Sequence, residues 1–258
     1  MAEQLITSRD NGRLMAARRV RDGRDKFRIF IEGRRLGEEA VRSGLKFTEC
    51  FLSEDFDDAG LAASIDAPTF RMPVNVFKTI ADTESPQGII LIAERPTMRP
   101  FTKTLLPLTL FLNEINNPSN LGAILRTAEA AGVGHVVLSK GSTDPYAPKA
   151  LRASMGSAFR ISIEEGESLA EAAAITRERG GVVTGADTHG TTTYLDADWS
   201  TPRMLVFGSE AHGLSTGEKA LLDETIHIPM ADSVESLNLA VAAGVILFEA
   251  RRQLTVRG

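Results

Sequence analysis

The sequence predicts an α/β fold, with a parallel-sheet domain at the C-terminal end and a smaller α/β domain before it. After Pro107, short apolar segments typical of buried strands alternate with helical segments, and this alternation favours a mostly parallel sheet with helices on both faces. The stretch 94–107 contains three prolines among polar residues, as domain boundaries often do. At about 150 residues per domain, the length of 258 residues allows one to two domains. We expect a first domain at 1–97, a linker at 98–107 and a second domain at 108–258.

The front segment is predicted to be a small α/β unit. A basic helix is expected at 11–22 and a second helix at 35–43, which ends at Gly44. Strands are expected at 27–31, 47–52 and 88–93. Alternation along the first strand places Phe27, Ile29 and Ile31 on one face.

The second domain contains the alternating elements. Strands are predicted at 108–112, 135–138, 181–185, 204–207 and 226–228. Helices are predicted at 121–131, 168–179, 216–223 and 237–252. The last helix is apolar nearly all round and is therefore expected to be buried against the sheet or another subunit.

Composition excludes several classes of protein. The hydrophobic fraction is 43% and the charged fraction 24%, so the chain is an ordinary globular protein and not a disordered, collagenous or coiled-coil one. Cys50 is the single cysteine, and the four histidines show no ligand spacing, so neither a disulfide nor a metal site is expected. The start of the chain is polar, and its longest apolar run, 237–248, is too short to span a membrane. We expect a cytoplasmic protein without a membrane partner.

The charge is unevenly distributed along the chain. The net charge of −5 would by itself disfavour a nucleic-acid partner. Residues 1–47, however, contain 12 basic and 7 acidic residues. This basic excess is expected to follow an RNA backbone, although a solvated helix face remains the alternative. The basic residues concerned are Arg9, Arg13, Arg18, Arg19, Arg24, Lys26 and Arg28.

Three segments place polar residues where strands meet loops or helices, which is the sheet edge where ligands usually bind. In 116–127, Asn120 suits a helix N-cap, and Arg126 lies one turn beyond Gly122, so a ligand would have room to approach. In 205–215, an apolar strand leads to Gly208 and Glu210. In 228–240, Ser236 suits the N-cap of the last helix, and Asn238 is an amide in its first turn that needs a partner. For each of these residues a purely structural role remains the alternative.

In their order and spacing, these segments resemble the three motifs of the SpoU/TrmH family of RNA ribose 2′-O-methyltransferases, a branch of the SPOUT superfamily. The resemblance covers the chain from Leu108 to its end. The front domain is similar to the RNA-binding accessory domain of these enzymes, which is related to ribosomal proteins that bind kink-turns. That second likeness rests on Ser8 and Asn11, on 30–33 and on 85–89.

The resemblance implies a deep trefoil knot that binds S-adenosylmethionine, and a homodimer whose active site is completed across the interface. It implies a catalytic set comprising Asn120, Arg126, Glu210, Ser236 and Asn238. The cofactor would lie against the backbone near Gly208, Ile228, Pro229, Met230 and Leu237, with Ala186 beside them. Arg152 resembles a family position near the RNA entrance, with a surface helix arginine as the alternative.

Arg126 is expected to clamp the phosphate next to the reacting ribose and to stabilise the developing alkoxide, because an arginine is a poor base. The chain departs from the family pattern at Asn117 and at Ala211 and His212. The second departure leaves open a role for His212 in proton transfer.

The lead hypothesis is therefore methylation of a ribose 2′-hydroxyl in structured RNA, with large-subunit rRNA favoured. DNA is excluded because it lacks the acceptor hydroxyl. A tRNA-modifying enzyme of the same family and a catalytically inactive RNA-binding knot protein are the alternatives.

Overall fold

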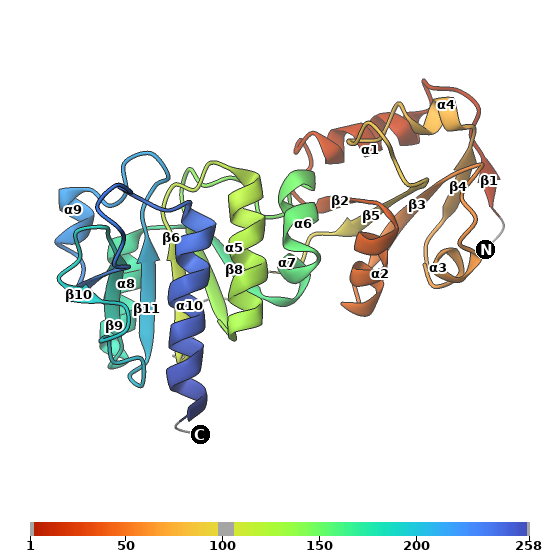
Figure 1. Cartoon of the computed structure of the whole chain (residues 1–258). Helices are drawn as coiled ribbons and strands as arrows, with labels where there is room; N and C mark the ends of the chain where they lie inside the picture. Colours follow the sequence, from red (N-terminus) through yellow and green to blue (C-terminus); the bar gives the residue numbers. More distant parts are fainter. Residues whose placement is uncertain (1–2, 98–105, 257–258) are drawn as a thin grey trace. The chain divides into compact units, whose positions relative to one another are not determined.

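A computed structural model describes residues 3–97 and 106–256. The chain divides into two compact units, one formed by Met1–Thr97 with Pro145–Phe159 and the other by Met98–Asp144 with Arg160–Gly258. Most of the linker expected at 98–107 lies outside the described residues. Each unit has its own sheet (Figure 1).

The first unit is built on a mixed five-stranded sheet with the strand order β1-β4-β3-β5-β2. β5 runs antiparallel to both of its neighbours, whereas β1 and β3 run parallel to β4. The strands are β1 Gln4–Leu5, β2 Arg28–Glu32, β3 Phe47–Ser53, β4 Thr69–Met72 and β5 Ile89–Glu94. The helices are α1 Gly12–Arg21, α2 Arg34–Arg42, α3 Ala59–Ala63, α4 Val74–Phe77, α6 Pro148–Ser154 and α7 Ser157–Arg160.

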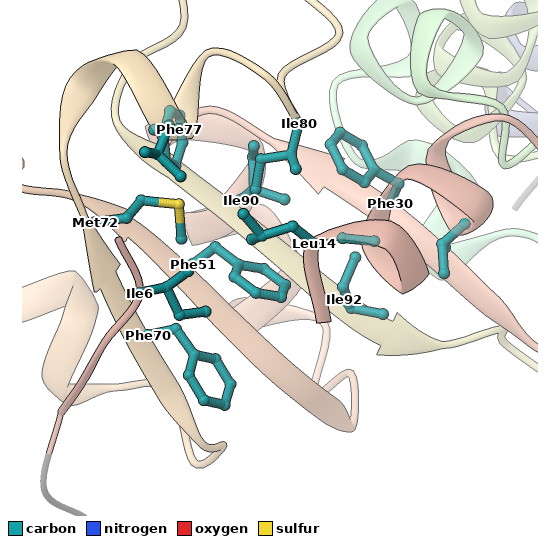
Figure 2. Packing of buried hydrophobic residues seen from close by; sticks show 13 residues of the cluster. Ile6, Leu14, Phe30, Phe51, Phe70, Met72, Phe77, Ile80, Ile90 and Ile92 are labelled. Atoms are coloured by element: carbon teal, nitrogen blue, oxygen red, sulfur yellow. The ribbon is translucent and has the colours of Figure 1, made fainter. Parts of the chain in front are cut away.

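One apolar core of the first unit lies between α1 and one face of this sheet. Leu14, Ala17 and Val20 recur at helical spacing along α1, and all three are buried. They join alternate strand residues such as Phe30 and Ile90 in one apolar cluster (Figure 2). The expected helix at 11–22 is confirmed, with Asn11 as its N-cap.

Phe27 was expected to share one strand face with Ile29 and Ile31. Ile29 and Ile31 are buried, but the side chain of Phe27 is 84% exposed. β2 begins only at Arg28, so Phe27 lies just before the strand. Alternation predicts which face a residue shares, but it does not predict how far that face is covered.

The second unit contains a seven-stranded sheet with the order β10-β12-β9-β11-β6-β7-β8, and every pairing between its strands is parallel. This confirms the predicted parallel sheet. The strands are β6 Leu108–Leu112, β7 His135–Ser139, β8 Ser162–Glu167, β9 Val182–Ala186, β10 Thr192–Thr193, β11 Arg203–Phe207 and β12 Glu224–His227. The helices are α5 Pro118–Ala131, α8 Leu169–Glu178, α9 Thr216–Lys219 and α10 Leu239–Val256.

Helix α8 packs on the sheet through Leu169, Ala172 and Ala173, which cluster with strand residues such as Val183 and Val206. α10 and α5 lie side by side and make extensive contact with each other (Figure 1). No helix in the described ranges is both long and apolar enough to cross a lipid bilayer.

The last helix was predicted to be buried against the sheet or another subunit, and within a single chain it is buried on one side only. Its inner residues, such as Ala243, Ile246 and Leu247, are buried, but Val241 and Phe248 are 53% and 51% exposed. α10 therefore presents an apolar outer face.

Candidate functional site

A cavity of about 670 Å³ opens in the second unit, beyond the carboxyl ends of β9, β11 and β12. In a parallel sheet these strand ends all lie at one edge, so the loops that follow them converge there. The first turn of α10 and Asn120 of α5 complete the wall. The polar segments singled out in the sequence therefore meet in one place.

The structure brings most of the predicted site residues to this cavity. Of the positions expected to lie near the cofactor, all but Pro229 line it: Ala186, Gly208, Ile228, Met230 and Leu237. Of the expected catalytic set, four residues line it: Asn120, Glu210, Ser236 and Asn238. His212 also lies on the wall and is exposed. The predicted clustering is thus observed for nine of these eleven positions, with Pro229 and Arg126 as the exceptions.

Three polar side chains form a hydrogen-bonded chain at the cavity wall. The amide nitrogen of Asn120 donates to Oε1 of Glu210, and its Oδ1 accepts a bond of 3.2 Å from the amide of Asn238. Oε2 of Glu210 accepts backbone N–H groups of Asn116 at 3.3 Å and Asn117 at 3.0 Å. Because its two oxygens receive three donors, Glu210 joins the loop after β11 to the loop after β6 and fixes the orientation of Asn120.

Two helix caps differ from the prediction. α5 begins at Pro118, and its N-cap is Asn117, whose side chain accepts the N–H of Ser119 at 2.9 Å. Asn120 therefore lies inside the first turn, and its side chain can point into the cavity. α10 begins at Leu239, and Asn238 caps it by accepting the N–H of Ala240 at 2.9 Å. The Asn238 amide nitrogen is thereby left to bind Asn120.

The loop after β11 explains why Gly208 is required there. A Cβ on this residue would lie 2.2 Å from the carbonyl carbon of Gly213. The two strands of the loop approach this closely because Ser209 and Gly213 exchange backbone hydrogen bonds of 3.0 and 2.9 Å. Gly213 itself has a φ of +63°, which favours glycine. The tight loop carries Glu210 and His212 at its tip.

Arg126 does not line the cavity. It lies six residues beyond Asn120, about 9 Å farther along the axis of α5. Its side chain is exposed and makes no ion pair or side-chain hydrogen bond with the residues that the structure describes. Gly122, which the sequence suggested as an approach point for a ligand, is buried. Within a single chain, Arg126 is therefore separate from the hydrogen-bonded side chains of Glu210, Asn120 and Asn238.

The cavity also contains charged residues that the sequence analysis missed. Asp187 follows Ala186 at the end of β9, and its carboxylate forms an ion pair with Lys219 of α9. Burial by itself would raise the pKa of Asp187, but the hydrogen bond from Lys219 and the N–H of His189 outweigh it and lower the pKa. The signal that could have found Asp187 is its position as the first charged residue after a buried parallel strand.

The composition of the wall suits S-adenosylmethionine. The cavity volume of about 670 Å³ lies within the range of about 300–1,000 Å³ that is typical of small-molecule sites. Apolar side chains such as Ile228, Met230 and Leu237 suit an adenine ring, and polar groups converge from several loops. Nδ1 of His227 is buried at this wall without a hydrogen-bond partner among the described residues, so a polar ligand would satisfy it.

Comparison with known proteins supports the same assignment. Residues 107–248 match the SpoU rRNA Methylase family, and residues 12–91 match the MRM3-like substrate binding domain. The fold and site define a methyltransferase of the SPOUT type, and the chain belongs to the SpoU rRNA methylase family.

Individual relatives span both units. An uncharacterized tRNA/rRNA methyltransferase of Synechocystis is 34% identical over 87% of this chain and 84% of its own length. The 23S rRNA (guanosine(2553)-2′-O)-methyltransferase RlmP of Bacillus subtilis is 28% identical over 86% of this chain and 88% of its own. The AdoMet complex of the SpoU methyltransferase AviRb from Streptomyces viridochromogenes superposes with a TM-score of 0.87 at 27% identity, covering 96% of this chain and 99% of that one.

Proposed function

We propose that this chain transfers the methyl group of S-adenosylmethionine to a ribose 2′-hydroxyl in large-subunit rRNA. The observation that carries the proposal is the Glu210–Asn120–Asn238 chain at the wall of a cavity at the carboxyl edge of a SpoU-type sheet. The cofactor is supported by the AdoMet-bound relatives of the same fold. An rRNA substrate is supported by relatives named for 23S rRNA 2′-O-methylation.

The substrate class is also supported by how far each relative extends. A TrmH/SpoU tRNA modifying enzyme from A. aeolicus covers 59% of this chain, with a TM-score of 0.52. An rRNA methyltransferase from Sinorhizobium meliloti covers 97% of it, with a TM-score of 0.86. The first unit therefore has its counterpart in the rRNA enzyme, which favours rRNA over tRNA.

Methyl transfer from S-adenosylmethionine does not need a strong acid or base catalyst, because the methyl donor is already activated. When bound, the cofactor would supply a methyl group on a positively charged sulfur, and this sulfur would leave as a neutral thioether when the methyl group is transferred to the 2′-oxygen. The protein must hold the hydroxyl in line and accommodate its developing negative charge. Asn120 and Asn238 are placed to orient the ribose, with Glu210 fixing Asn120. Arg126 clamps the adjacent phosphate, and the hydroxyl proton passes to phosphate or water.

A homodimer is part of the proposal, because Arg126 lies outside the cavity of its own chain. The exposed apolar face of α10, which includes Val241 and Phe248, supports an interface beside the site. We propose that a second chain seated on this face supplies its own Arg126 to the cavity. The proposal also retains the trefoil knot, a cytoplasmic location, and the absence of DNA and membrane partners.

The RNA-contacting residues of the first unit remain proposals of unequal strength. Arg9 and Arg19 are exposed, so their charges are free to meet phosphates. Arg18 binds Thr79, Arg28 binds Asp25 and Arg152 binds Asp82 at 2.7 Å, so these three are partly committed to the fold. We assign substrate binding to 1–97 and catalysis to 108–258.

The test is transfer of labelled methyl groups to purified rRNA and tRNA, followed by mapping of ribose methylation. We expect incorporation into large-subunit rRNA at a 2′-oxygen. The Arg126→Lys variant keeps the charge but loses the planar fork, and should lose most activity while binding the cofactor normally. Incorporation into tRNA alone would support the tRNA alternative. Binding of cofactor and RNA without transfer would support the inactive knot protein.

A further inference from the structure

The turn between α1 and β2 presents an aromatic ring to solvent. Phe27 is 84% exposed, the highest value among the large hydrophobic side chains that are exposed in the described residues. Its neighbours in the turn, Arg24 and Lys26, are also exposed. Neither of their side chains makes an ion pair or hydrogen bond within the described part of the chain. An exposed ring is thus preceded in the turn by two cations whose side chains have no partner among the described residues.

The backbone of this turn is held firmly, although the ring itself is free. Oδ1 of Asp25 accepts the N–H groups of Phe27 at 3.0 Å and Arg28 at 3.1 Å. Oδ2 of Asp25 accepts Nε and Nη2 of Arg28 at 3.0 and 2.9 Å. The carbonyl of Phe27 accepts the N–H of Arg95 at 2.7 Å. The ring therefore projects from a preorganised backbone, and binding a ligand would not require a loose loop to be ordered first.

The charges around the turn favour a polyanion. Arg28 neutralises Asp25, and Lys46 pairs with Glu94 at the adjoining strand ends. The net positive charge that remains in the turn belongs to Arg24 and Lys26. A protein partner would need a continuous apolar patch, whereas the residues beside Phe27 in the sequence are charged.

We propose that Phe27 stacks on an unpaired base of the RNA substrate while Arg24 and Lys26 bind the flanking phosphates. Unpaired bases expose the flat face that an aromatic ring needs, whereas the bases of a duplex stack on one another. The combination of a ring and cations is the one used for single-stranded nucleic acids. This inference rests on the proposed function, because it assumes that RNA is the substrate, and it adds an unpaired nucleotide as a feature of that RNA.

Tryptophan fluorescence tests the contact directly. The chain has one tryptophan, Trp199, which is 1% exposed. In the full-length Phe27→Trp variant, the new indole reports on the turn, and the wild type supplies the background signal. We expect titration with single-stranded oligouridylate to quench the emission of the variant, and a blunt RNA duplex of equal length to quench it much less.

Affinity supplies the second measurement. Phe27→Ser should weaken binding of the single strand by roughly 5- to 150-fold, whereas Phe27→Tyr should keep it. Leu5→Ser is the matched control, because Leu5 is a 73% exposed apolar residue of the same unit. Arg24→Ala with Lys26→Ala should lower the slope of log affinity against log salt by about 1.4.

The outcomes separate this site from the proposed function. Unchanged affinity of Phe27→Ser together with an unquenched Phe27→Trp would overturn the stacking site, even if the wild type methylates rRNA. Quenching by single-stranded RNA in a protein that transfers no methyl group would uphold the site and overturn the enzymatic function. Equal quenching by duplex and single strand would overturn the requirement for an unpaired base.

Discussion

Asn120 is held on two sides within the site. Its side-chain amide is hydrogen-bonded to Glu210, which lies 90 positions later in the chain, and to Asn238, which lies 118 positions later. Glu210 already accepts three donors, so we expect it to position Asn120 and not to accept the substrate proton. Residues bound in this way act as one unit, and their substitutions should not be additive.

Replacing Glu210 by Gln tests this positioning role. Gln has an NH2 group where Glu has a second oxygen, so either the Asn120 amide or the loop N–H groups would face a donor instead of an acceptor. We expect kcat to fall by roughly 10- to 100-fold, the size expected for a lost hydrogen bond to a charged group. Asn120→Ala should cost a similar factor, and the double variant little more than either. A double variant whose loss equals the product of the single losses would contradict the shared role.

His135 predicts a pH dependence of stability. It is 4% exposed at the start of β7, and its Nε2 lies 3.4 Å from Oε2 of Glu164. Burial lowers its pKa, and the nearby carboxylate only partly offsets this. In the unfolded chain, the imidazole therefore takes up a proton at the ordinary histidine pKa of about 6.5. In the folded chain, the same imidazole is protonated only at a lower pH.

Stability should thus be full above about pH 6.5 and decline below it, by at most about 1.4 kcal/mol per pH unit for this one proton. Urea unfolding at several pH values measures the decline. In His135→Gln the decline between about pH 6.5 and 5 should be shallower than in the wild type. An identical pH profile in both proteins would show that His135 does not cause it.

At the scale of elements, α10 is divided lengthwise. Ala243, Ile246, Leu247 and Ala250 recur at helical spacing and are buried, while Val241 and Phe248 lie on the exposed side. An apolar face of this kind beside a functional cavity is a typical docking surface. Periodicity could not divide the two faces in advance, because both are apolar.

The double variant Val241→Asp with Phe248→Asp should convert a dimer into a monomer of 27.8 kDa, because buried unpaired carboxylates oppose association. Light scattering after size-exclusion chromatography measures the mass. Methyl transfer should be lost with the dimer, since Arg126 lies outside its own cavity. Ala174→Asp on the exposed side of α8 is the control and should stay dimeric. A wild type that is already monomeric would refute the dimer.

Element types were predictable where patterns are local. β6 occupies the predicted range, and α8 lies within the helix predicted at 168–179, with Ser168 as its N-cap. The sequence analysis missed β8 and β10, which are the two edge strands of the seven-stranded sheet. β8 has the sequence Ser-Ile-Glu-Glu-Gly-Glu, which lacks the apolar run of a central strand because an edge strand is only half covered. Other short elements were missed as well, namely β1, β4, α3, α4, α6 and α7.

At the scale of the whole molecule, the basic excess of the first 47 residues is separated in sequence from the methyl-transfer motifs. Replacing Arg9 and Arg19 by Ala should therefore weaken rRNA binding and reduce its salt dependence, with the slope falling by about 0.7–0.9 for each phosphate that is no longer bound. Cofactor affinity, measured by calorimetry, should stay unchanged. A change in cofactor affinity without a change in salt dependence would contradict this division of labour.

The sequence by itself determined the parallel α/β class, the family and the three segments that converge on the cavity, because periodicity and motif spacing are local properties of the chain. Only the tertiary structure decided which amide caps which helix, that Asn120 bonds to Asn238, that Phe27 is bare and that one face of α10 is uncovered. The reason is physical: a side chain's partners and its exposure depend on what packs against it, and those groups lie far away in the sequence.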